Sequence, residues 1–112
     1  MKKVEAIIRP EKLDDVKAAL NALDIKGVTV TQVSGAGNQK GQKNYYRGAV
    51  VELALLPKVK IEIVAEDDRV SAITGAVAKA AKTGAIGDGK IFVTNVEEVI
   101  RIRTGDTGDG AI

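Results

Sequence analysis

Apolar and polar residues alternate in two stretches of the chain, residues 3–8 and residues 58–64. A period of two places successive side chains on opposite faces of a strand, so both stretches are predicted to be β-strands with one buried face. The apolar positions on that face are Val4, Ala6, Ile8, Val59, Ile61 and Ile63. The opposite face carries charged residues together with Ile7 and Val64. This mixture fits either burial against other subunits or a solvated face with a few apolar exceptions.

Two further stretches have apolar residues at spacings of three and four, which predicts two amphipathic helices. The first opens at Pro10 and has acidic residues in its first turn, where the helix dipole favours them. The second begins at the acidic residues 66–68 and has Lys79 and Lys82 at its basic end. The apolar stripes are Leu13, Val16, Leu20 and Leu23, then Val70, Ile73, Val77 and Ala80 or Ala81.

Residues 28–35 and 90–96 are predicted strands because they are rich in β-branched residues. A shorter strand-like piece follows at residues 99–103. The resulting order, β-α-β-β-α-β, is that of the ferredoxin-like arrangement in the α+β class. We therefore expect a four-stranded antiparallel sheet with two helices on one face.

The stretch between the second and third predicted strands has neither the apolar period of a strand nor that of a helix. Residues 35–48 show no apolar pattern, and the apolar run at residues 50–56 is closed by Pro57. A non-repetitive loop of this length is uncommon in a compact domain, so residues 36 to about 55 are either a disordered insertion or a functional arm. The glycine- and aspartate-rich residues 104–112 are expected to form a mobile tail.

Length and composition limit the functional classes. A chain of 112 residues suits one domain spanning residues 1–112, and a net charge of +2 gives no strong case for a nucleic-acid or membrane surface. The chain has neither cysteine nor histidine, which excludes a disulfide framework, a soft-metal zinc site and a histidine base. We see no signal peptide and no membrane span, so the expected location is cytoplasmic.

A glycine-rich turn at residues 83–90 reads T-G-A-I-G-D-G-K and is followed at once by a strand-like run. Glycines allow positive φ, and successive exposed amides in such a turn can form an anion-binding nest. Lys90 adds a positive charge where the turn ends, and Arg101 and Arg103 would point the same way in an extended segment. A nest, a lysine and two parallel arginines indicate a polyphosphate ligand, so nucleotide binding is the working hypothesis.

Residues 84–90 also fit the first seven positions of the P-loop pattern, but two observations exclude a P-loop. The eighth position is Ile91, where a P-loop has the Ser or Thr that binds magnesium. A predicted helix precedes the turn and a strand follows it, which reverses the P-loop order. Gly84 by itself fits a left-handed residue that ends the preceding helix.

These residues resemble the PII signal-transduction proteins, the nitrogen-regulatory family. The most specific match is the stretch T-G-A-I-G-D-G-K-I-F-V at residues 83–93. Further matches are Arg101-Ile102-Arg103, the stretch from Leu56 to Glu62, Gly35, Gly37, Gln39-Lys40-Gly41 and Tyr46-Arg47-Gly48-Ala49. The resemblance covers essentially the whole chain without an evident gap.

The resemblance implies a homotrimer of ferredoxin-like subunits with a nucleotide in each cleft between neighbours. ATP and ADP would compete there, and 2-oxoglutarate would join when Mg-ATP is bound. Residues 36–55 would be the T-loop, which docks on an ammonium channel or on enzymes of nitrogen assimilation. The chain would then be a signalling protein and not an enzyme, would bind no nucleic acid, and would meet a membrane only through a channel partner.

The resemblance also assigns the site residue by residue. The base and ribose would contact Ile7, Thr29, Glu62 and Val64. The phosphates would contact Gly35, Gly37, Gly87, Asp88, Gly89 and Lys90, with Arg101 and Arg103 from a neighbouring subunit. Gln39 would ligate the Mg²⁺ held by the ATP phosphates. The 2-oxoglutarate site would be formed by Gln39, Lys40, Gly41 and Lys58, with Lys58 paired to a carboxylate.

Three positions depart from the family pattern. Many relatives carry a uridylylated tyrosine at position 51 and others a phosphorylated serine at position 49, whereas this chain has Val51 and Ala49. We therefore predict control by ligands alone. Position 38 of the nucleotide site is usually an arginine, and Asn38 loses its charge-assisted contact with the phosphates. An adenine-nucleotide sensor without a 2-oxoglutarate response is the alternative.

Tyr45, Tyr46 and Arg47 are the candidate contacts with a protein partner, because adjacent tyrosines on a loop can anchor an interface. The tyrosines could equally pack against their own domain.

Three other functional classes share part of the pattern. RNA-recognition modules have the same element order but need aromatic residues on their central strands, where this chain offers only Phe92. A slow ATPase would need a positioned base, and only Asp88 and Glu62 supply carboxylates to the cleft. A trimeric metal-tolerance protein of similar shape is disfavoured because soft metals need cysteine or histidine ligands.

Overall fold

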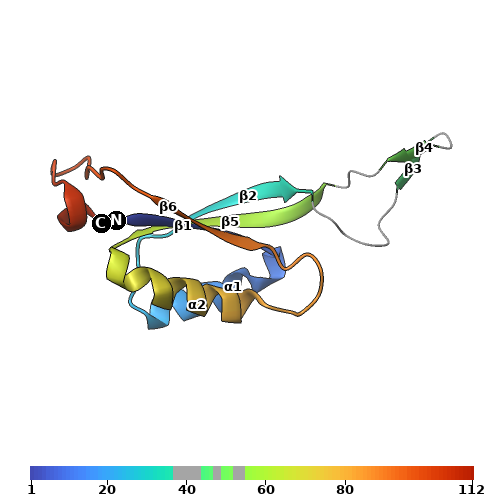
Figure 1. The fold of residues 1–112 in the computed structure, drawn as a ribbon, viewed down its shortest axis with the longest axis horizontal. Helices are drawn as coiled ribbons and strands as arrows, with labels where there is room; N and C mark the ends of the chain where they lie inside the picture. The colour runs from blue at the N-terminus through green and yellow to red at the C-terminus, as the bar shows by residue number, and fades with distance from the viewer. Residues whose placement is uncertain (37–43, 47–48, 52–54) are drawn as a thin grey trace.

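The computed structural model describes residues 1–36, 44–46, 49–51 and 55–112. Its body is one four-stranded sheet with two helices packed on the same face (Figure 1). The sheet strands are β1 (Lys2–Ile8), β2 (Thr29–Gly35), β5 (Leu56–Ala65) and β6 (Lys90–Asn95). The helices are α1 (Leu13–Ala22) and α2 (Val70–Ala81), each preceded by a short 3-10 helix, η1 (Pro10–Lys12) or η2 (Asp67–Arg69).

The strands lie in the order β2-β5-β1-β6, and every neighbouring pair is antiparallel. This arrangement confirms the predicted ferredoxin-like sheet and its β-α-β-β-α-β order. A separate two-stranded pair, β3 (Asn44–Tyr46) with β4 (Ala49–Val51), lies beyond the ends of β2 and β5 (Figure 1). It belongs to the stretch for which the sequence showed no period.

The core lies between the sheet and the two helices. The alternating apolar residues of β1 and β5 face the helices, and the stripes of α1 and α2 face the sheet. Burying these branched side chains on one face supplies the main stabilisation of such a layer. The core residues are Val4, Ala6, Ile8, Val16, Leu20, Val59, Ile61, Ile63, Ala65, Ile73, Val77 and Ala81.

The face of the sheet away from the helices, here called the open face, carries a line of ion pairs. Lys3 pairs with Glu62 at 3.3 Å, and Lys60 lies 3.7 Å from both Glu5 and Glu62. The cross-strand register brings these charges together, since Glu5 stands opposite Glu62 and Ile7 opposite Lys60. Ile7 and Val64 are half-buried on this face.

The sequence suggested that Pro57 closes the apolar run before it, but β5 begins at Leu56 and includes the proline. The register explains how a proline is tolerated there. Pro57 pairs with Ser34 of β2, whereas β1 pairs with β5 only from Val59 onward. At Pro57 the strand therefore has β2 as a neighbour on one side and no paired strand on the other. A residue that lacks an amide hydrogen is tolerated at such an edge position.

The predicted short strand at residues 99–103 is wrong. Only Ile100 makes a bridge, with Thr107, and residues 102–104 form a turn. The Gly105 amide donates to the carbonyl oxygen of Arg101 at 2.8 Å, and the Arg101 amide donates to that of Asp106 at 2.9 Å. These local hydrogen bonds fold the chain back on itself where two extended arginines were expected.

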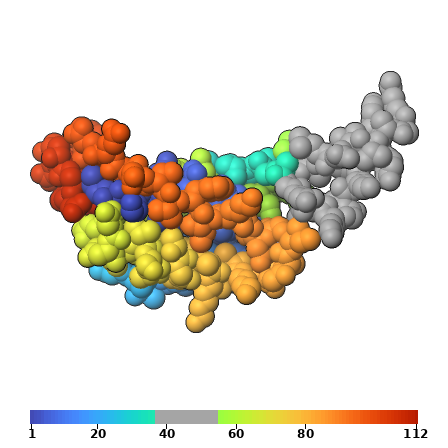
Figure 2. All heavy atoms as spheres, viewed as in Figure 1, coloured from blue at the N-terminus to red at the C-terminus, as the bar shows by residue number. Residues whose placement is uncertain are grey.

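Residues 104–112, for which the composition predicted mobility, carry the 3-10 helix η3 (Gly108–Ala111). Ala111 is buried, and the bridge between Ile100 and Thr107 connects this segment to the chain after β6. The segment lies at the end of the sheet opposite the turn that joins α2 to β6 (Figure 2). Its mobility in solution stays a prediction.

None of the helices in the described part of the chain is long and apolar enough to cross a membrane.

Candidate functional site

The glycine-rich turn joins the end of α2 to the start of β6, beside the end of β1. Gly87 and Gly89 have φ of 106° and 100°, a conformation that side chains with a Cβ rarely adopt. The predicted use of glycine is therefore confirmed at both positions. The order of helix, turn and strand also confirms that this is no P-loop, in which a strand leads into a helix.

Gly89 lies against the backbone of β1. A Cβ on Gly89 would stand 1.7 Å from the carbonyl oxygen of Ile7, far inside any permitted contact. Ile7 in turn pairs with Lys90 across the sheet. Glycine at position 89 thus allows the turn to close directly onto β1 and places Lys90 at the edge of the site.

The carboxylate of Asp88 holds the turn together from within. Its Oδ2 accepts the amides of Thr83 at 2.8 Å and Gly84 at 2.9 Å, and its Oδ1 accepts the Thr83 hydroxyl. The Thr83 hydroxyl and these amides, together with the Arg9 guanidinium, hold the pKa of Asp88 well below its usual range. Asp88 is therefore ionised and engaged in structure, and it is no free base for hydrolysis.

Arg9, at the end of β1, is a residue that sequence reasoning missed. Its Nε lies 3.0 Å from Oδ1 of Asp88, and its Nη2 donates to the Ile86 carbonyl at 2.8 Å. The two partners lie nearly eighty residues away in sequence, so no local spacing could have indicated the contact. A basic residue just before Pro10 was the only signal present.

Gly84 does not end helix α2 as a left-handed cap, as the sequence suggested. The cap residue is Lys82, which is extended, and Gly84 lies two residues further on with φ of 90°. The amide of Gly84 is instead bound to Asp88. Its role is thus in the turn and not at the helix end.

Lys58 of β5 reaches the same turn from the open face. Its Nζ donates to the carbonyl oxygen of Gly87 at 2.6 Å. A Cβ on Gly35 would lie 3.1 Å from Cγ of Lys58, so Gly35 packs directly beside the lysine stem. The turn is therefore held by Arg9 on one side and by Lys58 on the other.

A cavity of about 560 Å³ opens between β1, β2, β5 and the turn. It brings together seven of the predicted site residues, which come from four segments distant in sequence. These are Ile7, Gly35, Lys58, Gly87, Asp88, Gly89 and Lys90, and the other lining residues are Ala36, Leu56, Ala85, Ile86 and Phe92. The lining combines two lysine side chains with glycine backbone, which suits an anion.

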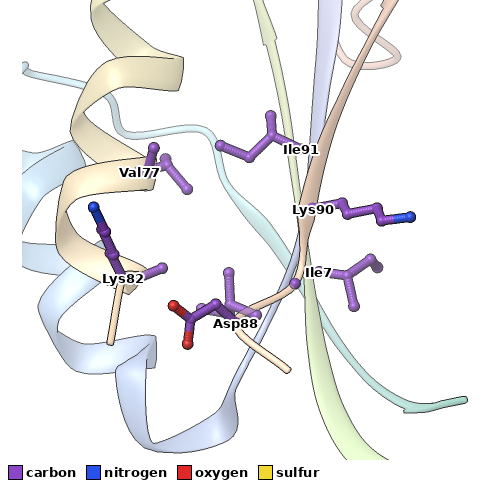
Figure 3. A pocket seen from close by; sticks show the side chains of 10 residues that line it. Ile7, Val77, Lys82, Asp88, Lys90 and Ile91 are labelled. Carbon is purple, nitrogen blue, oxygen red and sulfur yellow. The ribbon is translucent and has the colours of Figure 1, made fainter. Parts of the chain in front are cut away.

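A second cavity, of about 320 Å³, lies behind the turn on the helix side of the sheet. Figure 3 shows Ile91 pointing toward Val77 of α2, while Lys90 points the opposite way. Lys90 contributes to the lining of both cavities, whereas Ile91 lines only this one. Its lining is mainly apolar, with Lys82 and Asp88 beside it.

Thr29, Glu62 and Val64 lie further along the open face and line a third cavity of about 600 Å³. Thr29 stands directly opposite Glu62 in the register of β2 and β5. The structure therefore places the residues assigned to base and ribose on the same sheet face as Ile7 and Lys58, but toward the other end of β5.

Arg101 and Arg103 are not brought to the turn within one chain. They lie in the C-terminal segment, at the opposite end of β6 (Figure 1). Arg101 pairs with Asp106 at 3.4 Å, and Arg103 is exposed.

Several predicted site residues lie outside the described residues, so the structure does not place them. They are Gly37, Asn38, Gln39, Lys40, Gly41 and Arg47. Tyr45 and Tyr46 belong to β3, but their side chains are not described. Among the described residues, no group of three or more acidic, histidine or cysteine side chains could hold a metal ion.

The chain is similar over its full length to known proteins. The family model for Nitrogen regulatory protein P-II matches residues 1–106. Proteins of that name from Azospirillum brasilense and Rhizobium meliloti (strain 1021) are 60% and 58% identical over 112 residues, which is all of each chain. The protein of that name from Porphyra purpurea is 54% identical over the same length.

Proposed function

The chain belongs to the nitrogen regulatory protein P-II family, and from that premise we propose that it senses adenine nucleotides and 2-oxoglutarate. The family is one of regulatory proteins, in agreement with the expectation of a signalling protein and not an enzyme. ATP and ADP compete for one site, and 2-oxoglutarate joins Mg-ATP. The observation that carries the proposal is the cavity in which Gly87, Gly89, Lys58 and Lys90 converge.

The nucleotide lies along the open face. Strand residues rise by about 3.4 Å each, so Lys58 and Glu62 of β5 are separated by about 14 Å. That span suits an extended nucleoside polyphosphate whose base lies by Thr29, Glu62 and Val64 and whose phosphates lie at the turn. Among the hydrogen bonds of the described residues, none is donated by the amides of Gly87 or Gly89. Those amides are the nest that receives the phosphates.

The site is completed by a neighbouring subunit of a homotrimer. Within one chain Arg101 and Arg103 lie at the far end of β6 from the turn (Figure 1). Their guanidinium groups can serve the phosphates only if another copy supplies them. The mixed apolar and charged open face, with Ile7 and Val64, fits burial against such copies.

2-Oxoglutarate binds beside the phosphates, with a carboxylate on Lys58 and the remaining contacts from Gln39, Lys40 and Gly41. Gln39 also ligates the Mg²⁺ held by ATP. The distance from Lys58 Nζ to the Gly87 carbonyl is 2.6 Å, so an incoming carboxylate competes for an ammonium already placed at the turn.

The T-loop, residues 36–55, passes the signal to a protein target through Tyr45, Tyr46 and Arg47. The target is an ammonium channel or an enzyme of nitrogen assimilation, met in the cytoplasm. Val51 and Ala49 carry no hydroxyl, so neither position can be uridylylated or phosphorylated. The loop therefore answers to ligands alone.

Calorimetric titration with 2-oxoglutarate, with and without saturating Mg-ATP, tests this function. Binding only in the presence of Mg-ATP is the expected result. Binding of ATP and ADP with no response to 2-oxoglutarate would leave an adenine-nucleotide sensor. A protein that bound no nucleotide would show that the cavity at Gly87 to Lys90 serves another purpose.

A further inference from the structure

Arg9 joins two parts of the glycine-rich turn through two different nitrogen atoms. Its Nε is 3.0 Å from Oδ1 of Asp88, and its Nη2 is 2.8 Å from the Ile86 carbonyl oxygen. The Arg9 and Asp88 side chains are only about a fifth and a quarter exposed, so the pair is partly shielded from water. Arg9 thus spans the turn from a fixed point at the end of β1.

The position of Asp88 raises an electrostatic problem for an anion site. A carboxylate stands between Gly87 and Gly89, whose amides are free among the described hydrogen bonds. An uncompensated negative charge next to these two amides would repel phosphate oxygens, and the repulsion would grow with the charge of the ligand. Arg9 is the cation that pairs with Asp88 within the described residues.

We propose that Arg9 is a positioning residue of the nucleotide site, an inference that rests on the proposed function. It cancels the charge of Asp88 and holds the turn in the shape that presents the amides of Gly87 and Gly89. Arg9 does not itself line the cavity, so it acts through Asp88 and Ile86 and not by touching the ligand. Its contribution grows with the number of phosphates on the nucleotide.

The two observed contacts together require a guanidinium group, whereas cancelling the charge of Asp88 requires only a cation. A lysine at position 9 would restore the positive charge but has one nitrogen, whereas the observed contacts use two nitrogens with different acceptors. Comparing Arg9→Gln with Arg9→Lys therefore separates the effect of the positive charge from the effect of the two contacts on the shape of the turn.

The test measures the affinities of ATP, ADP and adenosine for the full chain by calorimetry. Lys17→Gln is the matched control, because it removes one positive charge from the exposed face of α1. We expect Arg9→Gln to weaken ATP binding by about tenfold, ADP binding by less, and adenosine binding by under about twofold. Arg9→Lys should recover most of the ATP affinity, and Lys17→Gln should change none of the three by more than about twofold.

The amides of Thr83 and Gly84 supply a second readout that needs no nucleotide. Both donate to Asp88, so their proton resonances and exchange rates in NMR report whether the turn keeps its shape. In Arg9→Gln we expect both amides to shift and to exchange faster, with little change at the helices.

Unchanged ATP affinity in Arg9→Gln, or equal weakening of all three ligands, would overturn the role of Arg9 while leaving the nucleotide site standing. Unaltered Thr83 and Gly84 amides would also overturn it. A wild-type protein that bound none of the three ligands would instead overturn the proposed function, and this role with it.

Discussion

The backbone of Gly89 lies so close to that of Ile7 that a Cβ on Gly89 would stand 1.7 Å from the Ile7 carbonyl oxygen. The φ of Gly89, 100°, is itself unfavourable for any other residue. Gly89→Ala should therefore force the turn away from β1 and destabilise the protein by at least about 2 kcal/mol. Urea unfolding measures this loss.

Gly75→Ala is the matched control for that substitution. Gly75 lies within α2, and a Cβ there would have no neighbour within 4 Å. Replacing a helical glycine by alanine should raise stability by about 0.5–1 kcal/mol. If Gly89→Ala proved as stable as the wild type, the close contact with Ile7 would not exist in solution.

Lys58→Met tests the other support of the turn. The change removes the hydrogen bond to the Gly87 carbonyl and the cation proposed to bind 2-oxoglutarate. We expect 2-oxoglutarate binding in the presence of Mg-ATP to weaken by at least about tenfold, while ATP binding changes less, since Lys90 and the amides remain. Calorimetry measures both, with exposed Lys79→Met on α2 as the control. Unweakened binding of 2-oxoglutarate would remove Lys58 from its site.

The pH dependence of the turn follows from Asp88. The Thr83 hydroxyl, the amides of Thr83 and Gly84 and the Arg9 guanidinium depress its pKa in the folded chain below the ordinary value of about 3.9. The stabilisation from the ionised carboxylate is therefore fully present above about pH 4 and is lost as pH falls through the depressed pKa. The Thr83 and Gly84 amide resonances should stay constant from pH 7 to about pH 4 and move only below it.

Asp88→Asn should alter those two amide resonances at every pH, because the amide side chain keeps one oxygen acceptor where the carboxylate had two. A wild-type transition of the Thr83 amide centred near pH 4 would contradict the depressed pKa.

A site shared between subunits can be tested by mixing two defective chains. One chain carries Arg101→Gln with Arg103→Gln, and the other carries Lys90→Gln. Each alone should bind ATP weakly, because in the proposed homotrimer each substitution would disrupt every intersubunit site. When the two chains are unfolded and refolded together, random assembly should restore about a quarter of the sites. Each restored site takes Lys90 from the first chain and Arg101 and Arg103 from the second. Calorimetric stoichiometry measures the recovery.

The control for this mixing is the two defective proteins combined without unfolding. No recovery is expected there if subunits of the proposed trimer stay assembled on the time scale of the titration. Failure to recover binding after refolding together would mean that Lys90, Arg101 and Arg103 do not serve one intersubunit site.

Local periodicity was sufficient for the layers of the fold. The alternation in β1 and β5 and the stripes of α1 and α2 predicted which face each element buries, because the pleat and the helical turn set that pattern residue by residue. Pro57 and Arg103 show where the same reasoning failed. Pro57 is tolerated in β5 because β1 begins to pair with β5 only at Val59. Arg103 lies in a turn that is closed by backbone hydrogen bonds of Arg101.

The sequence by itself determined that positions 87 and 89 must be glycine-like, that the chain has no histidine or cysteine chemistry, and most of the residues that form the core. It could do so because backbone freedom, side-chain chemistry and strand or helix period are properties of residues and their neighbours along the chain. Only the tertiary structure decided that Arg9 and Lys58 hold the turn and that Arg101 lies away from it. Those contacts join residues tens of positions apart, and the order β2-β5-β1-β6 sets which of them meet.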